Sequence, residues 1–404
     1  MYTPIEEYED IKEYDVVKKK VIDICKYSNS NVEAYDSKEY LSVEYNNFKE
    51  AYGQLPELTK DDLRKNFSSL LSKDFKGESF TVTTTGSTGT PTKTQWGYDE
   101  YNLSTIEVWK LRRKYGIKSG YSIIYFLNND NDDSIIKKDE KNIYYLRREF
   151  TLDNVKKYSE LINSLSNVLI YGSSSTLNNY ANAIKNFELD APKVNCIDLN
   201  GEMVYDNELE NIKSVFKTNV YNNYGGREVW PIALTCEHGT MHVCNNLVYV
   251  TANQDEELLV TSLTKKCQPL IKYKIGDLGR VCWGKCSCGK TSQIITELIG
   301  RKNDYVFFKD GTQRHWSIIS KAITQYIIEN DNKICEYSIT QKLDYSIVIN
   351  VVKDKEYNAD TEKSLIEVCR NICPSLDYSV VITDKITQNH RGKRIYFTNE
   401  LKQN

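Results

Sequence analysis

The chain has 404 residues, with 53 basic and 56 acidic side chains and a net charge of −3. Hydrophobic residues make up 40% and charged residues 27%, which is typical of globular proteins that bury a core. This length suits two domains better than one. A protein whose main role is to bind nucleic acid usually carries a basic excess. That excess is missing, so we expect no nucleic-acid partner.

The N-terminus, MYTPIEEYEDIKEY, is acidic and has no apolar centre, so we do not expect a signal peptide. The longest apolar runs, such as residues 122–126, are far shorter than the roughly 20 residues that span a bilayer. We therefore expect a cytoplasmic protein that does not enter a membrane. The 11 cysteines are scattered along the chain, which favours buried thiols and, where they cluster, a metal site over disulfides.

Strand-like and helix-like patterns alternate between about residue 60 and residue 300. Apolar and β-branched runs predict strands, whereas apolar residues at helical spacing predict helices. The predicted strands are 79–85, 122–127, 167–172 and 193–199, and the predicted helices include 100–116 and 152–166. This alternation is typical of layered α/β architecture with a mostly parallel sheet.

After Gly300 the pattern changes to that of a small α+β unit. Asp310-Gly311 between alternating residues predicts a hairpin. A helix near 315–329, strands at 336–341 and 345–352, a helix at 359–373 and a strand at 378–383 follow. About 100 residues can fold as a domain. We therefore predict a large N-terminal domain, residues 1–303, and a small mobile C-terminal domain, residues 304–404.

A glycine- and hydroxyl-rich stretch follows the first predicted strand. Glycines let a backbone turn until several N–H groups face one anion, and hydroxyls and a lysine add donors and charge. This stretch predicts a phosphate-binding loop made of Thr85, Gly86, Ser87, Thr88, Gly89, Thr90 and Lys93. It is not the GxxxxGK[ST] loop, because no Lys-Ser/Thr pair follows the second glycine at that spacing. The alternative interpretation is a polar turn between a strand and a helix.

Five motifs in chain order resemble those of the adenylate-forming enzyme superfamily, in its phenylacetate–CoA ligase and capsule-biosynthesis (CapK-like) branch. The resemblance covers about residues 60–400. The motifs are TTGSTGTPTK (84–93), NGE (200–202) with YNNYGGREVW (221–230), the strand-loop 258–281 that contains Gly-Asp, LIGRKNDYVFFKDG (298–311) and HRGKRIYF (390–397).

The resemblance implies roles for particular residues. Catalysis falls to Lys393, in a glycine-containing loop that swings over the site, and to Glu228, which holds Mg²⁺ against the phosphates. Asp304 is the hinge between the domains. The remaining nucleotide-binding residues are Gly201, Glu202, Tyr224 with Gly225 (stacking on adenine), Asp277 (on the ribose hydroxyls) and Arg301 (on ribose or phosphate). The alternatives are a surface glutamate, a structural tyrosine, a turn-capping aspartate and an exposed lysine.

Cysteine and histidine gather in two short segments, TCEHGTMHV (235–243) and KCSCG (285–289). Thiolates and imidazoles on tight loops are typical ligands of tetrahedral Zn²⁺, although the spacing departs from C-x₂-C and incidental thiols are the alternative. The resemblance favours Cys236, His242, Cys286 and Cys288, with His238 as a substitute for His242. Four protein ligands leave no open position, so this zinc would be structural.

The resulting expectation is an ATP-dependent ligase that converts a carboxylic acid to an acyl-adenylate, releases pyrophosphate and passes the acyl group to a thiol or an amine. The thiol would belong to coenzyme A or to a separate carrier protein. The alternatives are transfer of AMP to a cofactor hydroxyl and a non-catalytic nucleotide-binding protein. The cofactors expected are ATP, Mg²⁺ and structural Zn²⁺, with coenzyme A as one acceptor. The identity of the acid and the oligomeric state, including a homodimer, stay open.

Overall fold

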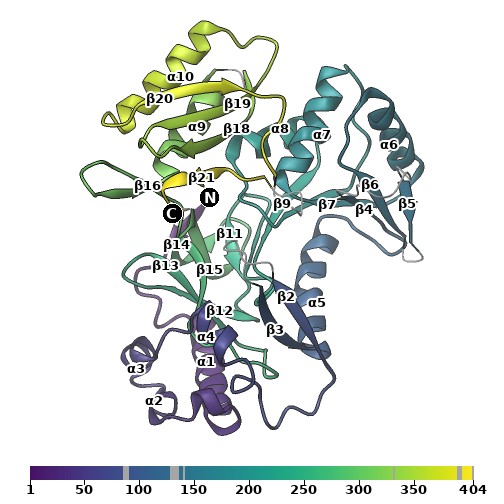
Figure 1. The fold of residues 1–404 in the computed structure, drawn as a ribbon. Coiled ribbons are helices and arrows are strands. Elements are labelled where there is room, and N and C mark those ends of the chain that lie inside the picture. The colour runs from purple at the N-terminus through teal and green to yellow at the C-terminus, as the bar shows by residue number, and fades with distance from the viewer. Residues whose placement is uncertain (85–90, 128–135, 140–141, 331–332, 389–393, 403–404) are drawn as a thin grey trace. The chain divides into compact units, whose positions relative to one another are not determined.

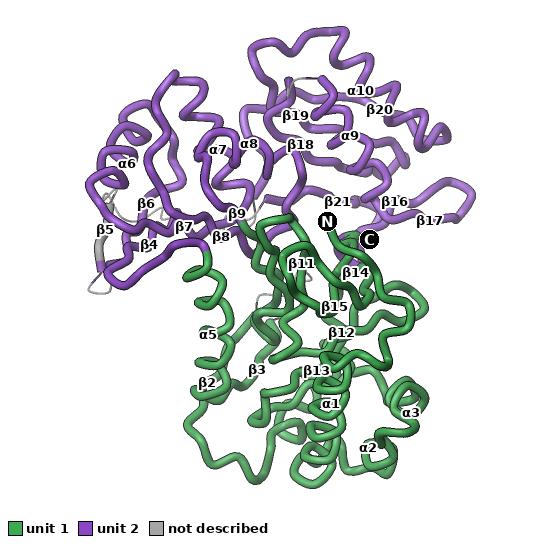
Figure 2. The backbone as a smooth tube through the Cα atoms, turned by 180° about the vertical axis from the view of Figure 1, so that it is seen from behind, with its two compact units in different colours: residues 1–114, 221–299 green, residues 115–220, 300–404 purple. Residues whose placement is uncertain are grey.

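The computed structural model describes residues 1–84, 91–127, 136–139, 142–330, 333–388 and 394–402. The chain forms two compact units, and each unit combines two separate stretches of sequence. Unit 1 comprises residues 1–114 and 221–299, and unit 2 comprises residues 115–220 and 300–404 (Figures 1 and 2). The chain thus leaves unit 1 and returns to it once.

The strands of unit 1 form antiparallel pairs. Pairing runs β12–β13–β14 on one side and β15–β11–β10–β9 on the other, and β1 pairs with β14. β13 is buried along its whole length, and its centre is the short apolar run Leu258, Leu259 and Val260. The strands are β1 (Tyr2–Pro4), β9 (Asn219–Tyr224), β10 (Ala233–Thr235), β11 (Met241–Val243), β12 (Val248–Ala252), β13 (Glu257–Ser262), β14 (Tyr273–Cys286) and β15 (Thr291–Arg301).

The first hundred residues of unit 1 supply its helices and a separate two-stranded hairpin. The helix α4 begins with a capping box, in which the side chains of Thr59 and Asp62 each accept a backbone N–H of the other's residue. The hairpin pairs β2 with β3 from Ser79–Gly97 to Thr84–Thr92. The elements are α1 (Lys12–Asn31), α2 (Lys38–Leu41), α3 (Phe48–Gln54), α4 (Lys60–Lys65), β2 (Ser79–Thr84), β3 (Thr92–Gly97) and α5 (Tyr98–Lys114).

The first part of unit 2 is a parallel sheet with three helices. Its strands follow the order β8-β7-β4-β6 with parallel pairing, and β5 is an antiparallel edge strand. The helices share one apolar core with the sheet, to which α6 contributes Val155, Tyr158 and Ile162 at helical spacing. The elements are β4 (Ser122–Leu127), β5 (Ile136–Lys138), β6 (Ile143–Arg147), α6 (Leu152–Ser164), β7 (Val168–Gly172), α7 (Ser174–Asn186), β8 (Cys196–Asn200) and α8 (Asp206–Phe216).

The second part of unit 2 has its own apolar core, built from residues between Val306 and Tyr378. A hairpin, β16–β17, leads into a sheet with the order β20-β19-β18-β21, of which β18–β19 is antiparallel and the other two pairs are parallel. The elements are β16 (Tyr305–Phe307), β17 (Gln313–His315), α9 (Ser317–Glu329), β18 (Ile334–Gln341), β19 (Ile347–Lys353), α10 (Ala359–Ile372), β20 (Tyr378–Ile382) and β21 (Phe397–Asn399).

The predicted fold class, α/β with a small C-terminal α+β part, is confirmed. Among the described residues before 300, the parallel strand pairs β4–β6, β4–β7 and β7–β8 lie within 115–220. The hairpin β2–β3 is antiparallel because its loop is too short for a parallel crossover. The division at residue 304, with a mobile C-terminal domain, stays a prediction. None of the helices in the described ranges is long and apolar enough to cross a membrane.

Candidate functional site: a buried glutamate, a tyrosine–aspartate pair and a cysteine–histidine cluster

The predicted phosphate loop falls in the connection between β2 and β3. Thr84 pairs with Thr92, so residues 85–91 join the two strands. Thr85 to Thr90 lie outside the described residues. Lys93 is exposed on β3 and pairs with Thr83. The hydroxyl-rich stretch therefore connects two strands, not a strand and a helix as in the alternative interpretation.

Glu228, the predicted magnesium ligand, lies in the short loop between β9 and β10 and is only 4% exposed. The Tyr273 hydroxyl, from β14, donates to Glu228 Oε1 at 3.1 Å. Gly226 is two residues earlier, and a Cβ there would lie 2.9 Å from Glu228 Oε2. A side chain at 226 would require the Glu228 carboxylate to shift, so glycine leaves room for the observed carboxylate position.

Lys265, which the sequence analysis did not single out, holds the same loop from the other side. Its ammonium donates to the main-chain oxygen of Glu228 at 3.0 Å and to Thr94 Oγ1 of β3 at 2.6 Å. It also lies 4.5 Å from the centre of the Trp96 ring, a cation–π distance. The side chain is 1% exposed. Burial lowers the pKa of Lys265 to about 7, although Glu100 and Glu228 act to raise it.

Two predicted nucleotide-binding residues are in contact. The Tyr224 hydroxyl, at the end of β9, donates to Asp277 Oδ2 at 2.8 Å. Asp277 lies in β14, in a stretch whose register against β13 is irregular between Lys274 and Leu278. Gly276 before it has φ +87°, a conformation that glycine adopts without strain. Both side chains are half-buried. Strand irregularities of this kind commonly redirect a side chain near a functional site.

The other predicted residues belong to unit 2. Gly201 and Glu202 follow β8, and Glu202 Oε1 accepts the Arg394 backbone N–H at 3.2 Å. Arg301 ends β15 and is exposed, and its main-chain oxygen accepts His315 Nε2–H at 2.8 Å. The main-chain oxygen of Asp304 accepts the backbone N–H of Trp316. Lys393 lies outside the described residues. Each unit thus carries its own part of the predicted site.

The predicted cysteine–histidine cluster assembles in unit 1. One ligand atom each from Cys236, His242, Cys286 and Cys288 lies within 4.8 Å of the others. The Sγ atoms of Cys236 and Cys286 are 3.8 Å apart, and Cys288 Sγ lies 3.3 Å from His242 Nε2. His238, the alternative ligand, is exposed and is not in this group. The cluster joins the β10–β11 connection to the β14–β15 connection.

The surroundings of the cluster suit a metal ligand set. Ser292 Oγ lies 2.8 Å from His242 Nδ1, so the ring can present Nε2 to the cluster, which is how a second hydrogen bond orients ligating histidines. Burial, followed by Lys290, lowers the pKa of His242 to about 4, so its imidazole is neutral. The backbone N–H of Cys288 donates to Cys286 Sγ at 3.5 Å.

The sequence analysis did not identify three residues of the described contacts: Tyr273, Lys265 and Arg394. Lys265 and Lys266 are adjacent in the motif 258–281, yet only Lys265 is buried. Adjacent lysines carry no signal that distinguishes them, because burial depends on which strands enclose each side chain. A Glu-to-Tyr or Glu-to-Arg pairing between residues far apart in the sequence likewise leaves no local pattern.

Comparisons with known proteins agree with the sequence motifs. No family model matches the chain. Protein CapK from Staphylococcus aureus is 24% identical over 373 residues, which is 86% of this chain and 80% of CapK.

Two solved structures share the fold. The crystal structure of 2-hydroxyisobutyryl-CoA ligase in the postadenylation state with R3-HIB-AMP matches with a TM-score of 0.74 at 13% identity, over 96% of this chain and 90% of that one. The anthranilate CoA ligase AuaEII in complex with anthranoyl-AMP matches with a TM-score of 0.51 at 11% identity, over 78% of this chain and 65% of that one. The chain therefore shares its fold with these two CoA ligases.

Proposed function

We propose that this protein activates a carboxylic acid with MgATP, forming an acyl-adenylate and releasing pyrophosphate, and then transfers the acyl group to a thiol or an amine. The observation that carries the proposal is the Tyr224–Asp277 contact beside the loop of buried Glu228. These residues occupy the predicted motifs on a fold shared with ligases solved with acyl-AMP.

The reaction joins two anions, because a carboxylate oxygen attacks the α-phosphorus and pyrophosphate leaves. The site therefore needs positive charge and oriented donors more than a base. Glu228 would hold Mg²⁺, a hard cation suited to carboxylate oxygen, which supplies charge to the phosphates. Tyr273 supports this role because its hydroxyl orients one carboxylate oxygen. Lys393 would stabilise charge on the carboxylate and the α-phosphate.

The nucleotide would be held by the hydroxyl-rich loop and by Asp277. The Tyr224 hydroxyl donates to one oxygen of Asp277, which orients the carboxylate toward the two ribose hydroxyls. Thr85 to Thr90 would cradle the β- and γ-phosphates, with Lys93 adding charge. Residues 304–404 would move about Asp304 and carry Lys393, since a few residues at element ends commonly absorb such closures.

We also propose that Cys236, His242, Cys286 and Cys288 bind a structural Zn²⁺. A tetrahedron with Zn–S bonds of about 2.3 Å places its sulfur atoms about 3.8 Å apart, and the Cys236–Cys286 separation is 3.8 Å. Three thiolates and one neutral imidazole complete the coordination, so the ion would stabilise the two connections and take no part in the chemistry. Coenzyme A or a separate carrier protein would supply the thiol that accepts the acyl group.

Acid-dependent ATP–pyrophosphate exchange over a panel of carboxylic acids tests the proposal. Exchange that requires one acid supports the ligase. Acid-independent transfer of AMP to a hydroxyl would favour the nucleotidyl-transfer alternative, and no reaction with any acid would favour a non-catalytic protein.

Two matched pairs of variants refine the assignment. Lys393→Ala should abolish exchange while ATP still binds, whereas Lys385→Ala, at an exposed lysine on the same stretch, should not. Asp277→Ala should weaken ATP binding, whereas Asp255→Ala, at an exposed aspartate, should leave it unchanged. Full exchange by Lys393→Ala would remove that lysine from the mechanism.

A further inference from the structure

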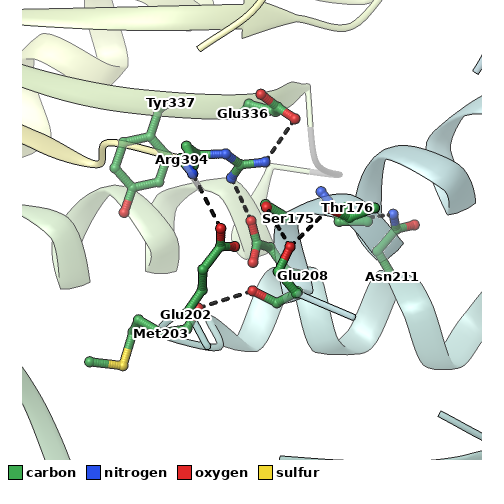
Figure 3. A network of polar contacts seen from close by, with 12 residues as sticks. Ser175, Thr176, Glu202, Met203, Glu208, Asn211, Glu336, Tyr337 and Arg394 are labelled. Atoms are coloured by element: carbon green, nitrogen blue, oxygen red, sulfur yellow. Dashed lines mark hydrogen bonds and ion pairs between the residues drawn. The ribbon is translucent and has the colours of Figure 1, made fainter. Parts of the chain in front are cut away.

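Unit 2 contains a buried charge cluster centred on Arg394 (Figure 3). The Arg394 guanidinium donates to Glu208 Oε1 at 2.6 Å and to Glu336 Oε1 at 2.7 Å. The side chains of Arg394 and Glu208 are each 3% exposed, and that of Glu336 is 9% exposed. Glu208 lies in the first turn of α8 and Glu336 in β18, so one guanidinium joins the two sequence segments of unit 2.

The backbone of Arg394 is fixed as well as its side chain. Its N–H donates to Glu202 Oε1 at 3.2 Å, and Arg394 forms a β-bridge with Gln388. The next residue, Ile395, donates its N–H to the main-chain oxygen of Thr387 at 2.9 Å. The two ends of the segment 389–393 are therefore paired with each other and held by Arg394, which directly follows Lys393 in the sequence.

Three carboxylates, those of Glu202, Glu208 and Glu336, act electrostatically on the Arg394 guanidinium, and Glu202 also acts on Arg148. Burial raises the pKa of Glu208, and Arg394 opposes that rise. Burial would lower the pKa of Arg394, but Tyr396 and the two glutamates raise it above its usual value, so the guanidinium stays charged. Glu202 Oε2 and Glu208 Oε2 have no hydrogen-bond partner within the described part of the chain.

Stability alone does not account for such a cluster. Replacing a buried ion pair by apolar residues is often neutral or stabilising, whereas ion pairs can specify one arrangement of the chain. Arginine suits this task because its guanidinium presents its donors in a fixed planar fork, whereas the lysine ammonium is a compact point charge on a flexible stem. The contacts of Arg394 all converge on the chain position next to the predicted catalytic lysine.

We propose that Arg394 is a positioning residue for acyl-adenylate formation, which it supports by holding residue 394 against Glu202, Glu208 and Glu336. The inference rests on the proposed function, because that function makes the preceding residue, Lys393, catalytic, and Arg394 would hold the chain next to it. Glu202 thereby gains a role that differs from nucleotide contact: it accepts the backbone N–H of the residue that follows Lys393.

Four variants separate positioning from general stability. Arg394→Met removes the charge, and Arg394→Lys keeps the charge but loses the fork. Glu336→Gln leaves Arg394 paired with Glu208 and serves as a milder change that should fold. Arg370→Met removes an exposed arginine at the end of α10 and is the matched control.

The contacts of Arg394 with Glu202, Glu208 and Glu336 form an anchor for residue 394. Hydrogen exchange of the nucleotide-free chain tests this anchor without any substrate. We expect Arg394→Met and Arg394→Lys to accelerate amide exchange in peptides covering 387–398 by about tenfold or more. Without the ion pairs to Glu208 and Glu336, local unfolding of this segment costs less free energy. Exchange in unit 1 and in Arg370→Met should match the wild type. Unchanged exchange at 387–398 in Arg394→Lys and Glu336→Gln would overturn the anchor.

Pyrophosphate exchange then tests the positioning role, with the acid that gives the wild type its highest rate. Misplacing a catalytic group by about 1 Å costs on the order of 100-fold, so kcat should fall by about that factor in Arg394→Lys while the KM for ATP stays within a few fold. Wild-type kcat in Arg394→Lys would refute the inference. If the wild type shows no exchange with any acid, the proposed function fails, and hydrogen exchange still decides the anchor.

Discussion

The buried ammonium of Lys265 makes stability depend on pH in a way that one substitution can expose. Lys265→Met keeps the length and apolar stem of the side chain but removes the nitrogen that contacts Thr94 Oγ1 and the Glu228 main-chain oxygen. Lys266→Met is the matched control, because Lys266 is the next residue and is exposed. Each variant removes one titratable lysine from the chain.

The magnitude follows from the lowered pKa of Lys265. Burial lowers it to about 7, whereas the ordinary value is 10.5. Between these two values the unfolded chain binds a proton that the folded protein does not, so stability rises with pH. Above pH 10.5 the lysine is neutral in both states and costs the folded protein nothing. As the pH falls toward 7, the free energy of unfolding decreases because only the unfolded chain takes up the proton. Since one pKa unit corresponds to about 1.4 kcal/mol, the gain from about pH 6 to about pH 9 is about 2–3 kcal/mol.

Urea unfolding at several pH values between about 6 and 9 measures how much Lys265 contributes to the pH dependence of the free energy of unfolding. The free energy of unfolding of the wild type, minus that of Lys265→Met, should rise by about 2–3 kcal/mol over the range. The same difference for Lys266→Met should stay constant. Parallel curves for the wild type and Lys265→Met would show that Lys265 keeps an ordinary pKa, and would refute the claim that its charge is desolvated.

Three further substitutions test contacts around the predicted site. Tyr273→Phe removes the donor to Glu228 Oε1, worth about 1–2 kcal/mol, and should raise the Mg²⁺ concentration for half-maximal pyrophosphate exchange; an unchanged requirement would separate Tyr273 from the metal. Tyr224→Phe removes the partner of Asp277 and should raise the KM for ATP by about 5- to 10-fold, and a normal KM would count against the ribose assignment. Ser292→Ala should weaken zinc binding by about 10- to 100-fold in a chelator competition, and equal retention would deny Ser292 that role.

Local patterns predicted the elements well. The helix at 152–166 and the helix at 359–373 correspond to α6 and α10, each of which begins with a side-chain cap, from Thr151 and Asn358. The Asp310-Gly311 hairpin forms between β16 and β17. These features depend on neighbours within a few residues, so a single sequence contains their whole signal.

Pairing between strands was harder to predict. The apolar residues Leu258, Leu259 and Val260 of β13 are compatible with a parallel or an antiparallel sheet, and the alternation of elements favoured mostly parallel pairing. Only the three-dimensional arrangement shows that β13 pairs antiparallel with β12 and β14. A buried strand has the same composition in both settings, because both of its faces meet apolar side chains.

The sequence by itself determined the fold class and predicted a set of site residues, including the four cysteine and histidine side chains that the structure brings within 4.8 Å of one another. Only the tertiary structure decided that Lys265 is buried beside Lys266, that Tyr273 reaches Glu228, and that Arg394 joins α8 to β18. The physical reason is that a motif specifies only the chemical type and spacing of its side chains. Whether a side chain is buried, and which group it contacts, depends on segments far apart in the chain. Those contacts set the charge and orientation of each group, and no local pattern contains them.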